Sequence, residues 1–192
     1  MTVVEDRIEM ANSGSAFTLD ELFDRLENMP VPEGYKVEIV EGTISMVPRR
    51  DVHWQTIRRI VRALEDTFGM DVNVLSDVRI DFPGLLNGYA PDVAKMREGA
   101  EKSAKGAWRH QDVEFVAEVI SQGTAANDYG PKKAAYAKAH VPVYLVADPY
   151  QRRCHVYTKP DGDDYAMETT VDFGYDVDLV DFTLSTADFP HD

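Results

Sequence analysis

Several features are scarce in this sequence of 192 residues, and each scarcity excludes a class of protein. Cysteine occurs once, as Cys154, so the chain can form neither an internal disulfide nor a metal cluster held by several of its own thiolates. No apolar run reaches the length of about 18 residues that a membrane-spanning helix needs, and residues 1–16 lack the apolar segment of a signal peptide. We therefore expect a cytoplasmic protein, with residues 1–16 a disordered leader and Cys154 a buried strand residue.

Basic residues are scarce at both ends of the chain. The formal net charge is −14, from 34 acidic and 20 basic residues. Residues 1–48 carry −7 (ten acids, three bases), residues 49–160 carry +3 (fourteen acids, seventeen bases) and residues 161–192 carry −10 (ten acids, no base). A polyanion such as DNA would therefore approach the middle of the chain, and we expect its affinity to be modest and salt-sensitive.

Local patterns predict a single α/β domain over residues 17–192, with a mixed sheet. Thr18 and Glu21 form a capping box that begins an amphipathic helix. Alternating apolar residues on either side of Glu41-Gly42 predict a hairpin of strands 35–40 and 43–47. Apolar residues at helical spacing predict a second helix over 51–68, with most of its arginines on the opposite face.

The remaining chain alternates strands with one further helix. A helix capped by Asp128 is expected to end near Ala139, and the polar segment 98–109 is expected to be a loop. Strands are predicted at 72–75, 78–80, 89–94, 112–121, 141–147, 154–158 and 165–170.

Three residues of the basic middle segment form the pattern that carries chemistry. Asp92 follows Pro91 at the start of a predicted strand, Glu118 lies inside a second strand, and Lys132 lies in the helix after it. Magnesium is commonly bound by one or two carboxylates together with water and substrate phosphate. Glu118 is surrounded by apolar neighbours, where a carboxylate is costly unless a cation binds it. That cation is either a metal ion or Lys132 itself in a structural ion pair, and Pro91-Asp92 is also a common turn signal.

An ordered set of motifs around these residues resembles the Uma-type putative restriction endonuclease family of the PD-(D/E)XK nuclease superfamily. The resemblance covers roughly residues 17–190. Its motifs are Glu38-Ile39-Val40-Glu41-Gly42, His53 in the next helix, Tyr89-Ala90-Pro91-Asp92-Val93, Val116 to Ser121, Asp128 with Lys132 and Tyr136, and Val141 to Pro149. It implies a restriction-endonuclease-like core, in which helices flank a central mixed sheet, and a Mg²⁺- or Mn²⁺-dependent endonuclease that hydrolyses phosphodiester bonds in DNA.

The chain departs from the family pattern at three positions. Ile120 stands where the superfamily's plain motif has lysine, two residues after the glutamate. The Uma-type pattern instead places a lysine four residues after the helical aspartate, where this chain has Lys132. Leu145 replaces the family's usual tryptophan and His140 its usual glycine.

The resemblance also implies roles for individual residues. Asp92, Glu118 and the carbonyl of Val119 would hold the metal, Lys132 would position or activate water, and Glu38 would assist the catalytic set. His53, Tyr136 and Lys133 are candidates for substrate contacts. Tyr136 is four residues from Lys132 and therefore shares its helix face. Whether Lys132 or Lys133 faces the site is left open, and so are local structural roles for Glu38 and His53.

Two other functions remain open at this stage. One is a catalytically silent module that keeps the nuclease fold and associates with DNA or protein. The other is a hydrolase of a small nucleotide or phosphorylated substrate, which suits the acidic chain. A homodimer is expected, because two-fold dimers are the commonest soluble oligomers.

Overall fold

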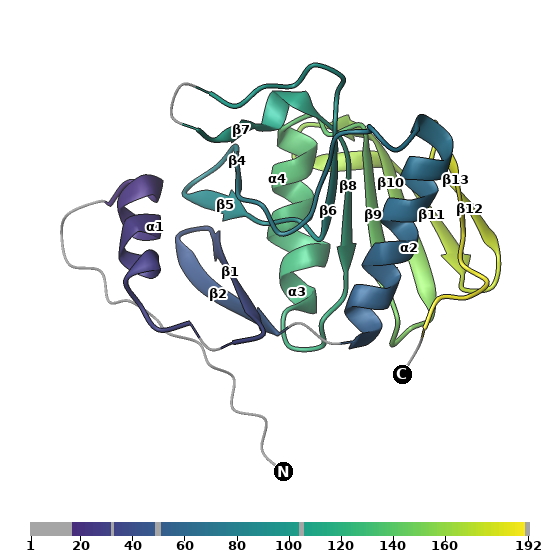
Figure 1. The fold of residues 1–192 in the computed structure, drawn as a ribbon, viewed down its shortest axis with the longest axis horizontal. Helices are drawn as coiled ribbons and strands as arrows, with labels where there is room; N and C mark the ends of the chain where they lie inside the picture. The colour runs from purple at the N-terminus through teal and green to yellow at the C-terminus, as the bar shows by residue number, and fades with distance from the viewer. Residues whose placement is uncertain (1–16, 32, 49–50, 104–105, 191–192) are drawn as a thin grey trace, which may run out of the picture.

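A six-stranded mixed sheet forms the centre of the fold. The computed structural model describes residues 17–31, 33–48, 51–103 and 106–190, so the expected leader lies outside the described residues. The strand order is β11-β10-β9-β8-β6-β3, with β8 and β9 parallel and the other neighbours antiparallel (Figure 1). The strands are β3 (Val74–Leu75), β6 (Val93–Met96), β8 (Val113–Val119), β9 (Val143–Asp148), β10 (Arg153–Asp161) and β11 (Asp164–Asp172).

A second sheet of five strands lies beside the first, to the left in Figure 1. Its order is β2-β1-β5-β4-β7, and the strands are β1 (Tyr35–Val40), β2 (Thr43–Pro48), β4 (Ile80–Phe82), β5 (Asn87–Tyr89) and β7 (Trp108–Arg109). β1 and β2 form the predicted hairpin. Glu41 (φ 49°) and Gly42 (φ 77°) connect them with the two positive φ angles that a tight hairpin turn requires.

The first two helices follow the predictions. α1 (Leu19–Glu27) has the Thr18 capping box, and α2 spans Asp51–Phe68. The third helical stretch begins earlier than predicted, as α3 (Ala125–Asn127), and continues through the π-turn η2 (Asp128–Lys132) into α4 (Lys133–Lys138). Asp128 is therefore not the helix cap. Pro131 cannot donate a helical hydrogen bond, and the helix widens around it.

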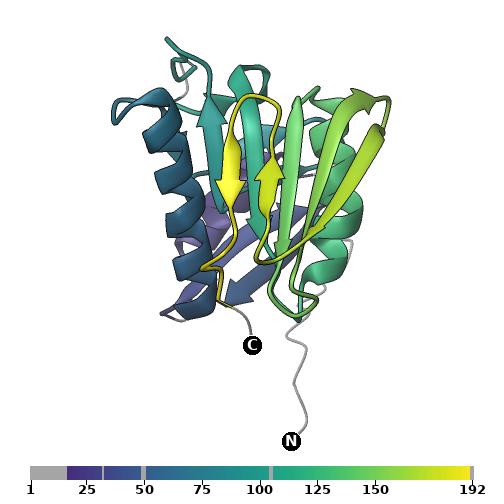
Figure 2. The same cartoon turned by 90° about the vertical axis from the view of Figure 1, so that its right-hand side faces the viewer.

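The two faces of the six-stranded sheet are covered by different elements. α2 and the hairpin of β12 (Asp176–Asp178) and β13 (Thr183–Ser185) pack on one face (Figure 2). α4 and residues of the five-stranded sheet pack on the other. Side chains of β8 alternate between these faces, with Ala117 and Val119 toward α2 and Val116 toward α4. Cys154 is fully buried on the α2 face, as expected.

Several short strands differ from the predictions. β3 covers only the last two residues of the predicted 72–75, and β4 is displaced by two residues from the predicted 78–80. The predicted strand 89–94 is interrupted by Ala90–Asp92. β7 lies within the predicted loop 98–109, after the short range 104–105 that is not described, and the pair β12–β13 was not predicted. Short strands depend on partners distant in sequence, which local patterns do not reveal.

Two further observations concern single features. His140 has φ 57°, a left-handed backbone conformation that glycine adopts more easily than other residues. Within the described ranges, no helix is long and apolar enough to cross a membrane.

Candidate active site

The alternation along β8 places Glu118 on the face that carries α4. Its neighbours on that face, Val116 and Ile120, belong to the core between the sheet and α4. Asp92 immediately precedes β6, and the pairing of Val93 with Ala117 brings Asp92 beside Glu118. The Asp92 amide donates to Glu118 Oε2 at 3.3 Å, so the two carboxylates that the sequence separates by 26 residues are neighbours.

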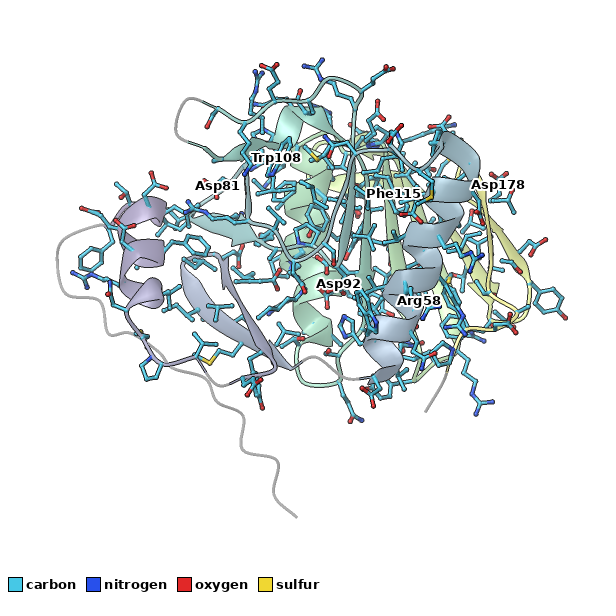
Figure 3. The ribbon with its side chains drawn as sticks, in the orientation of Figure 1. Arg58, Asp81, Asp92, Trp108, Phe115 and Asp178 are labelled. Carbon is cyan, nitrogen blue, oxygen red and sulfur yellow. The ribbon has the colours of Figure 1, made fainter. Side chains whose placement is uncertain are left out.

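Asp92 is held from three directions. Its Oδ2 is 2.7 Å from His53 Nε2 and accepts a hydrogen bond from the Val119 amide at 2.7 Å. Its Oδ1 accepts from Lys36 Nζ, also at 2.7 Å. His53 lies in the first turn of α2, and its Nδ1 is 3.3 Å from Ser121 Oγ. Figure 3 shows Asp92 near the centre of the molecule, between α2 and the α3–α4 stretch.

Glu118 is held through one oxygen by the helical stretch η2–α4. Its Oε1 accepts hydrogen bonds from Tyr136 Oη at 2.6 Å and from Lys132 Nζ at 3.1 Å. Lys132 Nζ also forms ion pairs with Glu38 Oε2 at 2.7 Å and Asp128 Oδ1 at 3.1 Å. One lysine therefore connects three carboxylates from three different elements.

β1 contributes Lys36 and Glu38, which share one face of the strand because they are two residues apart. Glu38 Oε1 accepts from the Ala90 amide at 2.9 Å, and Lys36 Nζ donates to the Ala90 carbonyl at 3.0 Å. Lys36 Nζ is also 3.7 Å from Glu118 Oε2. The loop Ala90–Asp92 is thus held against β1 through its backbone.

The site has an excess of buried negative charge. Four carboxylates and two ammonium groups lie together, and their side chains are at most 7% exposed. If the four acids are counted as ionised carboxylates, these six groups sum to −2. A buried charge is costly unless a partner compensates it, so the arrangement favours an additional cation. The carboxylates are Glu38, Asp92, Glu118 and Asp128, and the ammonium groups are Lys36 and Lys132.

The same contacts shift the pKa values of the two central acids in opposite directions. Burial alone would raise both. The pKa of Asp92 is nevertheless lowered, because the Lys36 ammonium and His53 stabilise the carboxylate. For Glu118, burial outweighs Lys132 and Lys36, and together with the charges of Asp92 and Asp128 it raises the pKa to about 8.

The lysines remain protonated. Burial would lower the pKa of Lys132, but the carboxylates of Asp128, Glu118 and Glu38 raise it well above its usual value. Asp92, Glu38 and Glu118 likewise raise the pKa of Lys36 despite its burial. Both side chains are therefore cations that donate hydrogen bonds, and neither can accept a proton from water.

The oxygen atoms around Asp92 and Glu118 fit a magnesium or manganese ion whose remaining ligands are water and substrate phosphate. Among the described residues, no three His, Cys, Asp or Glu side chains are placed to ligate one ion on their own. Asp92 and Glu118 form a pair of adjacent carboxylates beside the Ala90 carbonyl, and hard cations with one or two protein carboxylates complete their shell with water and phosphate. The site thus suits an ion that shares its ligands with a substrate.

The structure brings together most of the residues that the sequence singled out. Asp92, Glu118, Lys132, Glu38, His53 and Tyr136 form one connected network, and Val119 joins it through its backbone amide. Lys133 does not join it. Its Nζ pairs with Asp164 Oδ1 at 2.8 Å and lies 4.8 Å from the centre of the Tyr157 ring, so Lys132 is the lysine that faces Glu118.

Two members of the network were missed. Lys36 is absent from the predicted site, although its spacing of two residues from Glu38 on a predicted strand places both side chains on one face. Asp128 was interpreted as a helix cap, although its spacing of four residues from Lys132 also allowed an ion pair within the helix. Both signals were present, but many charged pairs with such spacings have no function.

Comparison with known proteins now adds to this geometry. Residues 20–187 match the model of the Uma2 family, described as putative restriction endonuclease. The chain belongs to this family. The matched range contains every residue of the network described above.

A solved structure shares the fold. The crystal structure of a putative nuclease belonging to DUF820 from Anabaena variabilis ATCC 29413 superposes with a TM-score of 0.68 at 17% identity, covering 90% of this chain and 97% of that chain. At this identity the likeness establishes the fold alone, which this chain shares with a protein described as a putative nuclease. No curated protein shows significant similarity to the chain.

Proposed function

We propose that this Uma2-family chain is a divalent-metal-dependent endonuclease that hydrolyses phosphodiester bonds in DNA. The observation that carries the proposal is the juxtaposition of Asp92 and Glu118, with a net negative charge buried around them. Family membership supports nuclease chemistry, and the charge excess supports the need for a cation. The proposal names DNA as the substrate and Mg²⁺ or Mn²⁺ as the ion.

Asp92 and Glu118, with the carbonyl of Val119 as a third candidate, are the residues that would hold the ion. When bound, such an ion polarises the scissile phosphate and offsets the negative charge that develops during hydrolysis. His53 and the Val119 amide fix the orientation of the Asp92 carboxylate through its Oδ2. Tyr136 does the same for Glu118 through its Oε1.

Lys132 acts in this proposal as a positioning cation. Because its pKa is raised, its Nζ keeps its protons and serves as a hydrogen-bond donor to water or phosphate, and not as a base. Glu38 and Asp128 hold the ammonium in place beside Glu118. Of the two roles that the sequence leads us to expect for Lys132, positioning or activating water, the proposal takes the first.

The exposed face of α2 supports the approach of a polyanion. Arg58 and Arg62 are exposed on this helix, whose first turn supplies His53 to the site. Phosphate contacts of this kind position a nucleic acid without reading its sequence. The strongly acidic segment after residue 160 would limit non-specific binding.

Cleavage of a supercoiled plasmid tests the proposal. We expect nicking with Mn²⁺ or Mg²⁺ and none with Ca²⁺. Asp92→Asn and Glu118→Gln, which keep side-chain shape, should reduce the rate on the order of 10³-fold, because the metal supplies several kcal/mol of transition-state stabilisation. Asp172→Asn, a matched change of an exposed aspartate paired with Arg153, should cleave like the wild type.

Equal cleavage by the wild type and both site variants would overturn the assignment of Asp92 and Glu118. RNA and mononucleotides incubated in parallel identify the substrate class. Turnover of mononucleotides alone would favour the small-substrate hydrolase, and absence of turnover on every substrate would favour the silent module.

A further inference from the structure

The ammonium of Lys36 lies between two carboxylate oxygens, Asp92 Oδ1 and Glu118 Oε2, that no other side chain of the described site binds. Glu118 Oε2 also accepts the hydrogen bond from the Asp92 amide at 3.3 Å. Asp92 Oδ2 is held by His53 and Val119, and Glu118 Oε1 by Lys132 and Tyr136. The remaining oxygens, Asp92 Oδ1 and Glu118 Oε2, lie 2.7 and 3.7 Å from Lys36 Nζ.

The surroundings of Lys36 Nζ consist of oxygen atoms from several elements. The Ala90 carbonyl lies at 3.0 Å, and carboxylate oxygens of Glu38 and Asp77 both lie at 3.9 Å. Four segments of the chain, β1, the loop that carries Asp77, the Ala90–Asp92 loop and β8, thus present oxygens to one point. Hard divalent cations select such an all-oxygen environment.

We propose that Lys36 is a competitor for the metal position: its ammonium compensates the acidic site when no metal is present, and a divalent ion must displace it to bind both Asp92 and Glu118. This inference rests on the proposed metal site. Magnesium binds its oxygen ligands at about 2.0–2.1 Å, closer than the ammonium lies. An ion at Asp92 Oδ1 directed toward Glu118 would therefore overlap the place of Nζ, and two like charges at that separation repel each other.

The side chain of Lys36 is able to leave this position. Its charge sits at the end of a flexible four-carbon stem, whereas Lys132 is fixed by three carboxylates at 3.1 Å or less. Asp77, which is 25% exposed, offers Lys36 a carboxylate on the solvent side of the site. Lys36 is only 5% exposed while it lies between the carboxylates, so its departure would also uncover them.

The test measures metal affinity and not activity. Binding of Mn²⁺ to the full chain is followed by electron paramagnetic resonance for the wild type, Lys36→Met, Lys36→Arg and Lys138→Met. With the four buried acids ionised, the wild type has two negative charges that its two ammonium groups do not compensate, and removing the Lys36 charge leaves three. We therefore expect Lys36→Met to bind Mn²⁺ at least tenfold more tightly, while Lys36→Arg binds no better than the wild type. Lys138→Met, an exposed change on α4, should not alter the affinity.

Unchanged or weaker Mn²⁺ binding by Lys36→Met would overturn the proposal, because it would make Lys36 a helper or a bystander of the ion. If Asp92→Asn no longer binds Mn²⁺ while Lys36→Met still binds it tightly, the competition between Lys36 and the ion takes place at Asp92. The affinity for Mn²⁺ can be measured even if the plasmid assay shows no cleavage. Failure of the proposed function and failure of this inference are therefore distinguishable.

A second measurement needs no variant and covers the case in which Lys36→Met does not fold. Acetylation of lysines in the wild type is mapped by mass spectrometry with and without saturating Mn²⁺. Displacement should raise the rate at Lys36 by at least several-fold, because the amine leaves its buried ion pairs, while Lys138 reacts at the same rate. An unchanged or slower rate at Lys36 in the presence of bound Mn²⁺ would contradict displacement.

Discussion

Adjacent residues of β8 face two different environments. Val119 points to the face covered by α2, where the core consists of apolar side chains such as Ile60 and Leu145. Glu118 points to the opposite face, where it meets Lys132 and Tyr136. One face of the central sheet thus provides stability through packing, and the other combines packing with a buried ionic network that is available for chemistry.

The first way to test this comparison is to remove a charge from the ionic face. Lys132→Met leaves the carboxylates of Glu38, Asp128 and Glu118 without their shared cation. We expect the free energy of unfolding, measured in urea, to fall by about 3–5 kcal/mol, the usual result of breaking a buried ion pair from one side.

Lys133→Met is the matched control for this change. Its ion pair with Asp164 involves a carboxylate that is 63% exposed, so its loss should change the free energy of unfolding by about 0–1 kcal/mol. Similar effects of the two variants would show that the network around Lys132 is solvated and that the two faces do not differ as described.

The second test removes volume from the apolar face. Leu145 is fully buried against α2, and Leu145→Ala should lower the free energy of unfolding by about 2–5 kcal/mol, through lost transfer energy and the cavity left behind. The affinity of the folded protein for Mn²⁺ should stay within about twofold of the wild type, because changes in separate regions act independently. A parallel loss of Mn²⁺ affinity would mean that the two faces are coupled.

We expect the smallest effect, negligible chemical labelling of the native protein, at Cys154, which packs on the apolar face. Burial raises the pKa of its thiol to about 12, so at pH 8 only about one thiol in 10⁴ is ionised. Iodoacetamide at pH 8 should label the native protein negligibly and the urea-unfolded protein rapidly, as read by mass spectrometry. Rapid labelling of the native chain would show that this face opens to solvent.

Local elements were predictable where the signal lies within a few residues. The capping box of Thr18 and Glu21, the turn at Glu41-Gly42 and the bounds of α2 are all confirmed. Each depends on contacts between sequence neighbours, such as the bond from the Glu21 amide to Thr18 Oγ1. The division into two large sheets and the C-terminal pair β12–β13 were not predicted, because strand partners lie far apart in the chain.

The site was predictable in part and for a different reason. Asp92, Glu118 and Lys132 were identified by an ordered set of motifs, and the structure places them in one network. Asp128 is predicted as a helix cap, but in the structure it lies inside a helical stretch, in the π-turn that contains Pro131, and pairs with Lys132. The spacing of Lys36 from Glu38 places both side chains on one face of a strand, but nothing local shows whether that face turns toward a site or toward solvent.

The sequence by itself determined the local elements, the segregation of acidic residues to the two ends and the residue types of a metal-dependent site. Only the tertiary structure decided which charges meet. Pairing of β6 with β8 brings Asp92 to Glu118, and the five-stranded sheet brings Lys36 and Glu38 to both. The physical reason is that charges act over a few ångströms in space, whereas sequence patterns record only distances along the chain.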